Sequence, residues 1–144
     1  MPDTFDQATR SRIMSRVRST NTTPELRLRK ALFARGLRYR IYASGLPGKP
    51  DIVFPGRKVV IFVHGCQWHW HGCSRSRMPS TNVEYWERKI SRNQERDCDN
   101  LAKLMASGWR VLVVWECSIK LRTLDVLADQ VADWVRSRAG AASF

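Results

Sequence analysis

The spacing of hydrophobic residues predicts three helices in this chain. Apolar side chains recur at steps of three and four, the period of an amphipathic helix, in residues 23–36, 81–108 and 124–135. Thr23 is the expected N-cap of the first helix. Thr81 and Glu84 have the spacing of a capping box at the start of the second, and we expect that helix to break near Asn93.

Four shorter stretches have the composition of strands. They are residues 37–42, 51–54, 58–64 and 110–115. The second and third flank Pro55 and Gly56 and should pair as a hairpin. Residues 59–63 are apolar on both faces, which is typical of a central strand. The order α, β, β, β, α, β, α predicts a mixed α/β sandwich, and residues 139–143 are expected to be a frayed tail.

Basic residues outnumber acidic residues by 25 to 13, which gives the 144-residue chain a net charge of +12. So large an excess favours a polyanionic partner over a basic surface that only aids solubility. Nucleic acid is favoured over a membrane, because no lipid-facing helix accompanies the charge and no apolar run could cross a bilayer. We therefore expect a cytoplasmic protein that binds nucleic acid.

The positive charge is concentrated near the start of the chain, where no acid lies between Asp6 and Glu25. We predict that residues 1–20 form a mobile basic arm and that residues 21–144 form a single domain. The arm residues expected to contact nucleic acid are Arg10, Arg12, Met14 and Arg16.

All three histidines of the chain, His64, His69 and His71, lie close together and are interleaved with Cys66 and Cys73. Thiolate and imidazole ligands suit tetrahedral zinc, and a closed structural site needs four of them. Cys66, His71 and Cys73 supply three from one loop. The fourth ligand must come from elsewhere in the chain.

The remaining thiols are Cys98 and Cys117. Cys98 shares a predicted helix face with apolar residues, where a cysteine is usually a small core residue. Cys117 follows the strand at residues 110–115 and is the ligand we assign. The histidine spacing and a reducing compartment count against two disulfides. His64 and His69 are then free imidazoles beside the metal site and become candidates for acid–base chemistry.

Asp51 follows Pro50 at the start of a predicted strand. A short hairpin loop places it opposite residues 60–62, near the end of the strand that carries His64. An aspartate after such a loop is ordinarily a turn residue. The adjacent histidine and cysteine cluster favours a magnesium-dependent nuclease site instead.

Four motifs of this chain resemble the very-short-patch-repair (Vsr) endonucleases, in the same order and at similar spacing. The similarity covers roughly residues 5–135. The motifs are Ala8-Thr9-Arg10-Ser11, Leu46-Pro47-Gly48-Lys49-Pro50-Asp51, His64-Gly65-Cys66 with Trp68-His69, and Gly108-Trp109-Arg110-Val111-Leu112 with Val114-Trp115-Glu116-Cys117.

The resemblance implies a restriction-endonuclease-like fold, in which helices flank a mixed β-sheet, with a structural zinc. It also implies magnesium-dependent nicking 5′ to the thymine of a T·G mismatch, which arises when 5-methylcytosine deaminates. Asp51 and the backbone carbonyl of Val63 would bind magnesium, and His69 would be the base that activates water. His64 would contact the scissile phosphate, and Glu25 would hold a metal-bound water.

Two positions depart from the family pattern. Val63 stands where a threonine is expected, which is tolerable if only the main-chain oxygen binds metal. Gln67 stands where an aromatic wedge is expected beside Trp68, so Gln67 could read a base edge instead. Trp68 and Trp86 are the expected probes of the mismatch, because unstacking is easiest where a duplex is already weak. Core packing is the alternative role for both tryptophans.

The sequence is also compatible with three other functions. A restriction enzyme of the same fold would cut both strands of matched DNA, and a noncatalytic zinc module would leave His64, His69 and Asp51 without a role. A structural or protein-interaction domain would not need the clustered histidines. The expected partner is double-stranded DNA with a T·G mismatch. We also expect a functional link to a DNA cytosine methyltransferase, a mismatch-repair protein as candidate partner, and a monomer at the bacterial nucleoid.

Overall fold

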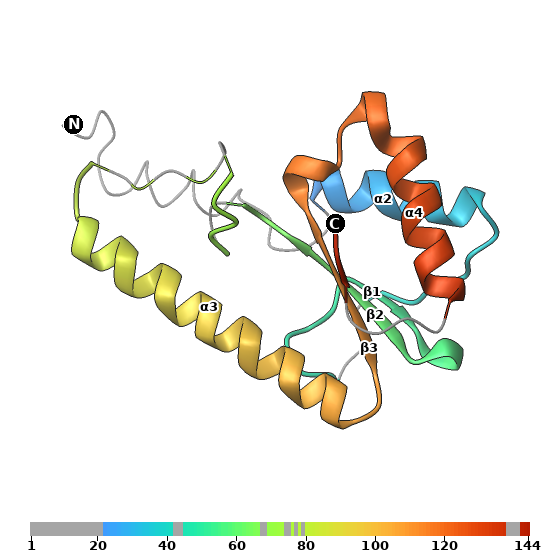
Figure 1. Cartoon of the computed structure of the whole chain (residues 1–144), viewed down its shortest axis with the longest axis horizontal. Coiled ribbons are helices and arrows are strands. Elements are labelled where there is room, and N and C mark those ends of the chain that lie inside the picture. The colour runs from blue at the N-terminus through green and yellow to red at the C-terminus, as the bar shows by residue number, and fades with distance from the viewer. Residues whose placement is uncertain are drawn as a thin grey trace, which may run out of the picture.

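The computed structural model describes residues 22–41, 45–66, 69–73, 76, 78, 80–137 and 142–144. Helices cover both faces of one sheet, in a mixed α/β arrangement (Figure 1). None of the helices in this part of the chain is long and apolar enough to cross a membrane. The expected basic arm lies outside the described residues, as do its Arg10, Arg12, Met14 and Arg16 and the loop residues Gln67 and Trp68.

The sheet has the strand order β1-β2-β3-β4. β1 (Ile52–Phe54) pairs antiparallel with β2 (Val59–His64) through a 3-10 turn at Pro55–Arg57, which confirms the predicted hairpin. β2 pairs in parallel with β3 (Arg110–Trp115), which has the predicted bounds. Because parallel strands run the same way, the carboxyl ends of β2 and β3 meet at one edge of the sheet.

Two layers of core hold the sheet between its helices. α2 (Thr23–Ala34) and α4 (Leu124–Arg136) lie together on one face, and α3 (Val83–Ala106) lies on the other and extends beyond the sheet (Figure 1). In β2, Ile61 packs in the cluster under α2 and α4, whereas Val60 packs with residues of α3. β2 is therefore buried on both faces, which confirms the central strand.

The second helix differs from its prediction in two respects. Its N-cap is Asn82 in a left-handed conformation (φ 54°) without a side-chain cap, so the expected capping box is wrong. The helix also runs through Asn93 without a break for 24 residues. It contains no glycine or proline. The side-chain Oδ1 of Asn93 accepts a hydrogen bond from the guanidinium of Arg96 on the same helix (3.1 Å).

Three expectations at chain ends and edges are also corrected. The strand expected at residues 37–42 is reduced, among the described residues, to a single bridge between Arg40 and Val53. The first helix has Thr22 as its N-cap. The end of the chain is not frayed at Ala142–Ser143, which form β4 in parallel with β3, and Phe144 packs against the core.

Candidate metal centre and active site

Three cysteines and one histidine come together beyond the carboxyl ends of β2 and β3. Cys66 follows β2 closely and Cys117 lies in the 3-10 turn after β3, so the parallel pairing brings them near each other. His71 and Cys73 approach from the loop after Cys66. The ligand atoms of all four lie within 4.8 Å of one another, and Nδ1 of His71 is 3.3 Å from Sγ of Cys117. These are the four residues expected to hold zinc.

The chemistry of this cluster fits a metal ion. Cys66 is fully buried, its N–H donates to Oε1 of Glu116 (3.2 Å), and its carbonyl accepts from the hydroxyl of Ser76 (2.7 Å). Burial raises the pKa of the Cys66 thiol to about 12. The thiol therefore stays protonated unless a cation offsets the cost of a buried thiolate. Three thiolates and one imidazole are a common ligand set of structural zinc.

Cys98 lies outside this cluster, on α3. It is exposed, so the expectation that it is a core residue is wrong. Met105, on the same helix face, is half-exposed as well. Each of the two directly follows a residue of the inward face, Asp97 and Leu104, and so lies about 100° around the helix from that face.

Asp51 is held at the start of β1 by main-chain contacts to β2. Its N–H donates to the carbonyl of Ile61 (3.0 Å), and its Oδ2 accepts from the N–H of Val63 (2.7 Å). Burial raises the pKa of Asp51 to about 7, and the negative charge of Glu25 adds to the rise, whereas the bond from Val63 opposes it. A carboxylate that is this costly to ionise gains from a bound cation.

His64 and His69 form a stacked pair next to this carboxylate. Their ring centroids are 3.8 Å apart and the planes are inclined by 6°. Nδ1 of His69 lies 2.5 Å from Oδ2 of Asp97, which comes from α3. A carboxylate acceptor at Nδ1 favours the tautomer with its proton there, in which Nε2 of the neutral His69 ring keeps its lone pair.

The stacking decides what the two imidazoles can do. A metal ion lies close to the plane of the imidazole that binds it, so two parallel stacked rings cannot share one ion. Although the ligand atoms of His64, His69 and Asp97 lie within 4.8 Å of one another, the stacked rings favour proton transfer over binding of one shared ion. Burial lowers the pKa of His64 to about 4, with a further lowering by His69. His64 is thus neutral at pH 7 and carries one N–H.

Asp97 was missed in the sequence, where it is one of several acids on a charged helix. One signal was available: Asp97, Leu101 and Leu104 lie on one helix face, and Leu104 is fully buried under the sheet. An acid on an inward face needs a partner. The partner, His69, is 28 residues away in the chain and has no local signature.

These groups open onto one cavity of about 1070 Å³ between α3 and the ends of β2 and β3. Its lining includes Asp51, Val63, His64, His69 and Asp97.

Glu25 takes a different position from the other expected catalytic residues. It is 3% exposed on α2 and pairs with Arg29, also buried, at 3.9 Å. Glu25 is not among the described residues that line the cavity, and it acts on the site through its charge, which raises the pKa of Asp51.

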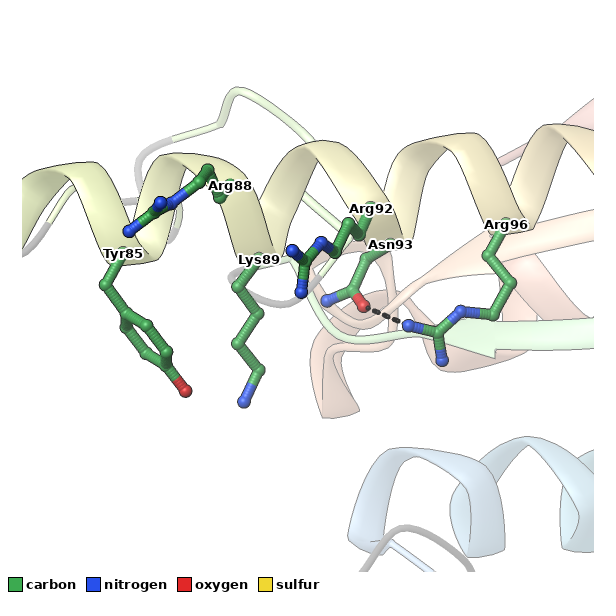
Figure 2. A pocket seen from close by; sticks show the side chains of 6 residues that line it. All are labelled: Tyr85, Arg88, Lys89, Arg92, Asn93 and Arg96. Carbon is green, nitrogen blue, oxygen red and sulfur yellow. Dashed lines mark hydrogen bonds between the residues drawn. The ribbon is translucent and has the colours of Figure 1, made fainter.

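A basic stripe runs along the first half of α3 toward this cavity. Figure 2 shows its side chains projecting from the helix around a smaller pocket of about 380 Å³, lined by Tyr85, Arg88, Lys89, Arg92, Asn93 and Arg96. Arg96, the last residue of the stripe, directly precedes Asp97 of the larger cavity on α3. Trp86 is half-buried beside it, with the Lys89 ammonium 5.6 Å from the centre of its ring. Cationic side chains at this spacing suit the phosphates of a nucleic acid.

A partly buried carboxylate, a stacked imidazole pair with a second carboxylate bonded to one ring, and a basic helix beside them are typical of a nuclease, a hydrolase of phosphodiester bonds.

Comparisons with known proteins identify its family. Residues 2–75 match the family of the DNA mismatch endonuclease Vsr. The chain is 41% identical over 138 residues to the DNA mismatch endonuclease Vsr of Escherichia coli K12, covering 94% of this chain and 88% of that protein. It is 47% identical over 119 residues to the type II nicking enzyme V.XorIIP of Xanthomonas oryzae pv. oryzae, covering 83% and 88%. The chain belongs to the Vsr family of DNA mismatch endonucleases.

Proposed function

We propose that this endonuclease nicks one strand of double-stranded DNA 5′ to the thymine of a T·G mismatch and so initiates very short patch repair. The chemistry is magnesium-dependent hydrolysis of a phosphodiester bond. The observation that carries the proposal is the meeting of Asp51, the stacked His64 and His69, and Asp97 around one cavity.

Asp51 and the backbone carbonyl of Val63 are the proposed magnesium ligands. Oxygen ligands suit magnesium, and a partly buried carboxylate with Glu25 nearby gains from a cation. When bound, magnesium supplies positive charge that stabilises the developing charge on the phosphate and acidifies water. Glu25 does not line the cavity but its charge reaches Asp51, and it would hold a water molecule near the ion.

The histidines move and hold the protons. Asp97 accepts the Nδ1 proton of His69, so Nε2 of His69 takes the proton from the attacking water. The Asp97 carboxylate then stabilises the imidazolium that forms. His64 is neutral because burial lowers its pKa, and it donates its N–H to the scissile phosphate. Its ring, stacked on His69, keeps the base facing the same phosphate.

Zinc is the proposed ion at Cys66, His71, Cys73 and Cys117. It would fasten the loop after β2 to the turn after β3. His69 lies in this loop between Cys66 and His71, so the same fastening holds the catalytic base in place.

The DNA contacts complete the proposal. The basic arm, residues 1–20, and the α3 stripe bind phosphates, while Gln67, Trp68 and Trp86 probe the mismatch by stacking or by reading a base edge. The support is the +12 charge and the basic stripe that ends at Asp97. The fold is proposed to be restriction-endonuclease-like, with residues 21–144 as one domain.

The biological setting follows from the substrate. A T·G mismatch arises from 5-methylcytosine, so we propose that the protein works with a DNA cytosine methyltransferase, as a monomer at the bacterial nucleoid. A mismatch-repair protein is a candidate partner. The type II nicking enzymes among the relatives bear names that also fit a link to modification systems.

A nicking assay tests the function. Purified protein is incubated in magnesium with duplexes that carry T·G in every flanking context, and the nicks are sequenced. We expect nicks in one strand only, 5′ to the mismatched thymine, and none with Asp51→Asn. Cleavage of both strands in matched DNA would identify a restriction enzyme, and binding without cleavage would identify a noncatalytic zinc module.

A further inference from the structure

Trp115 stands between the metal centre and the catalytic histidines. It is the last residue of β3 and is paired in register with His64, the last residue of β2. Two positions further on, Cys117 belongs to the metal cluster. Trp115 also lines the cavity that holds Asp51.

The indole of Trp115 contacts one histidine of each site. It stacks on His71, with ring centroids 4.2 Å apart and planes inclined by 12°. It also meets His64 edge-to-face, at 5.2 Å and 77°. Since His64 stacks in turn on His69, an unbroken series of ring contacts runs from the metal cluster to the catalytic base.

Two residues at the end of the chain, Ser143 of β4 and Phe144, also hold Trp115 in place. Nε1 of Trp115 donates to the hydroxyl of Ser143 (3.0 Å), and the Trp115 main-chain N–H donates to the carbonyl of Phe144 (2.9 Å). The ring cannot rotate without breaking the first of these bonds. This bond opposes rotation of the indole, so the geometry allows a displacement of His71 to reach His64.

We propose that Trp115 is a positioning residue that transmits the placement of His71, as set by the metal centre, to His64 and through it to His69. The metal centre then does more than stabilise the fold, because the position of its imidazole ligand determines the alignment of the catalytic pair. The inference rests on the roles proposed above for His64 and His69. A misalignment of about 1 Å at reacting groups is enough to cost about a hundredfold in rate.

The test replaces zinc by cadmium, which binds the same soft ligands through longer bonds and so shifts His71 in a folded protein. The imidazole signals are followed by two-dimensional ¹H–¹⁵N NMR, which is practicable because the chain has only three histidines. In the wild type, cadmium should shift the signals of His64 as well as those of His71. In Trp115→Leu, the shift at His71 should remain and the shift at His64 should disappear.

Kinetics give a second readout on the same proteins. We expect Trp115→Leu to lower kcat about ten- to a hundredfold with little change in KM, and cadmium to slow the wild type but not this variant. Trp109→Leu is the matched control, because Trp109 lies at the opposite end of β3 and packs against the second core cluster. It should behave as the wild type in both measurements.

The outcomes separate this inference from the proposed function. A shift at His64 that survives in Trp115→Leu, or that is absent in the wild type, overturns the coupling whatever the nicking rate. If Trp115→Leu does not fold, Trp115→Phe takes its place in the test. The smaller phenyl ring cannot contact both His64 and His71, so the cadmium-induced shift at His64 should fall to less than half of that in the wild type. An undiminished shift at His64 in Trp115→Phe would overturn the proposal. A wild type that shows the coupling but never nicks T·G duplexes refutes only the proposed function.

Discussion

Asp97 and His69 meet at 2.5 Å although one belongs to the long helix α3 and the other to the loop that holds the metal cluster. The contact joins the two parts of the protein for which we propose separate tasks, DNA contact along α3 and metal binding in the loop. It also leaves His69 a single nitrogen, Nε2, with which to accept a proton.

The first prediction concerns this contact. Asp97→Asn should lower kcat by about a hundredfold or more, because an amide neither fixes the tautomer of His69 nor stabilises its imidazolium. Asp99→Asn, an exposed acid two positions further along α3, is the control and should nick normally. Single-turnover nicking of a T·G duplex measures both. Equal rates for the two variants would remove Asp97 from the mechanism.

The second prediction is that Asp51→Asn abolishes nicking and yet stabilises the folded protein at alkaline pH when magnesium is absent. The folded-state pKa of Asp51, about 7, is above its ordinary value of 3.8. The fold therefore favours the protonated carboxyl, and stability is lost as the pH rises from about 4 to about 7. The variant should gain roughly 2–4 kcal/mol over the wild type at pH 8 and much less at pH 5. Urea unfolding without magnesium at the two pH values measures this.

The third prediction follows from the same pKa. Magnesium competes with the proton on Asp51, so its apparent dissociation constant should rise about tenfold for each pH unit below 7 and level off above it. Magnesium titrations of nicking between pH 5.5 and 8.5 give the constants. Flat magnesium affinity across this range would contradict the assignment of Asp51 as the ligand.

The fourth prediction distinguishes the two cysteines that follow the histidine loop. Cys117→Ser should lose bound zinc and much of its folding free energy, since structural zinc contributes about 10–16 kcal/mol in small domains. Cys98→Ser, at an exposed position, should keep both. Metal analysis and circular dichroism check the pair, and a fully zinc-loaded Cys117→Ser protein would show that the ligand assignment is wrong.

The fifth prediction concerns the α3 stripe. Replacing Arg88 and Arg92 by glutamine should lower the magnitude of the slope of log K against log salt by about 2, because each phosphate contact contributes about 0.9. The control replaces Lys120 and Arg122 by glutamine in the same way. These two exposed residues lie next to α4, on the other side of the sheet from α3. If both double variants change the slope equally, the stripe has no special role in DNA binding.

The parts of the site that depend on neighbouring strands could be predicted from the sequence. The hairpin around Pro55 sets the register, and the register places Asp51 beside the end of β2. The spacing of the cysteines and histidines was equally informative, because tetrahedral coordination needs a fixed set of ligands and the chain offers few. Both inferences use distances that local geometry determines.

What escaped prediction depends on tertiary contact. The pairing of Asp97 with His69 needs α3 to cross the sheet at one particular angle, and no local pattern specifies that angle. β4 is two residues long and forms because β3 has a free edge, not because Ala142 and Ser143 favour a strand. The exposure of Cys98 likewise depends on which face of α3 packs against the sheet, since Cys98 lies about 100° around the helix from Asp97.

The unbroken course of α3 restricts how this enzyme can diversify. Each residue added to or removed from a helix rotates everything beyond it by about 100° and moves it by about 1.5 Å along the axis. Leu104 and Asp97 hold the second half of α3 against the sheet and His69, so a one-residue deletion between Arg88 and Arg96 would rotate Arg88 and the start of the stripe relative to Asp97. New sequence preferences can arise here by exchanging side chains, whereas a change in helix length would separate recognition from catalysis.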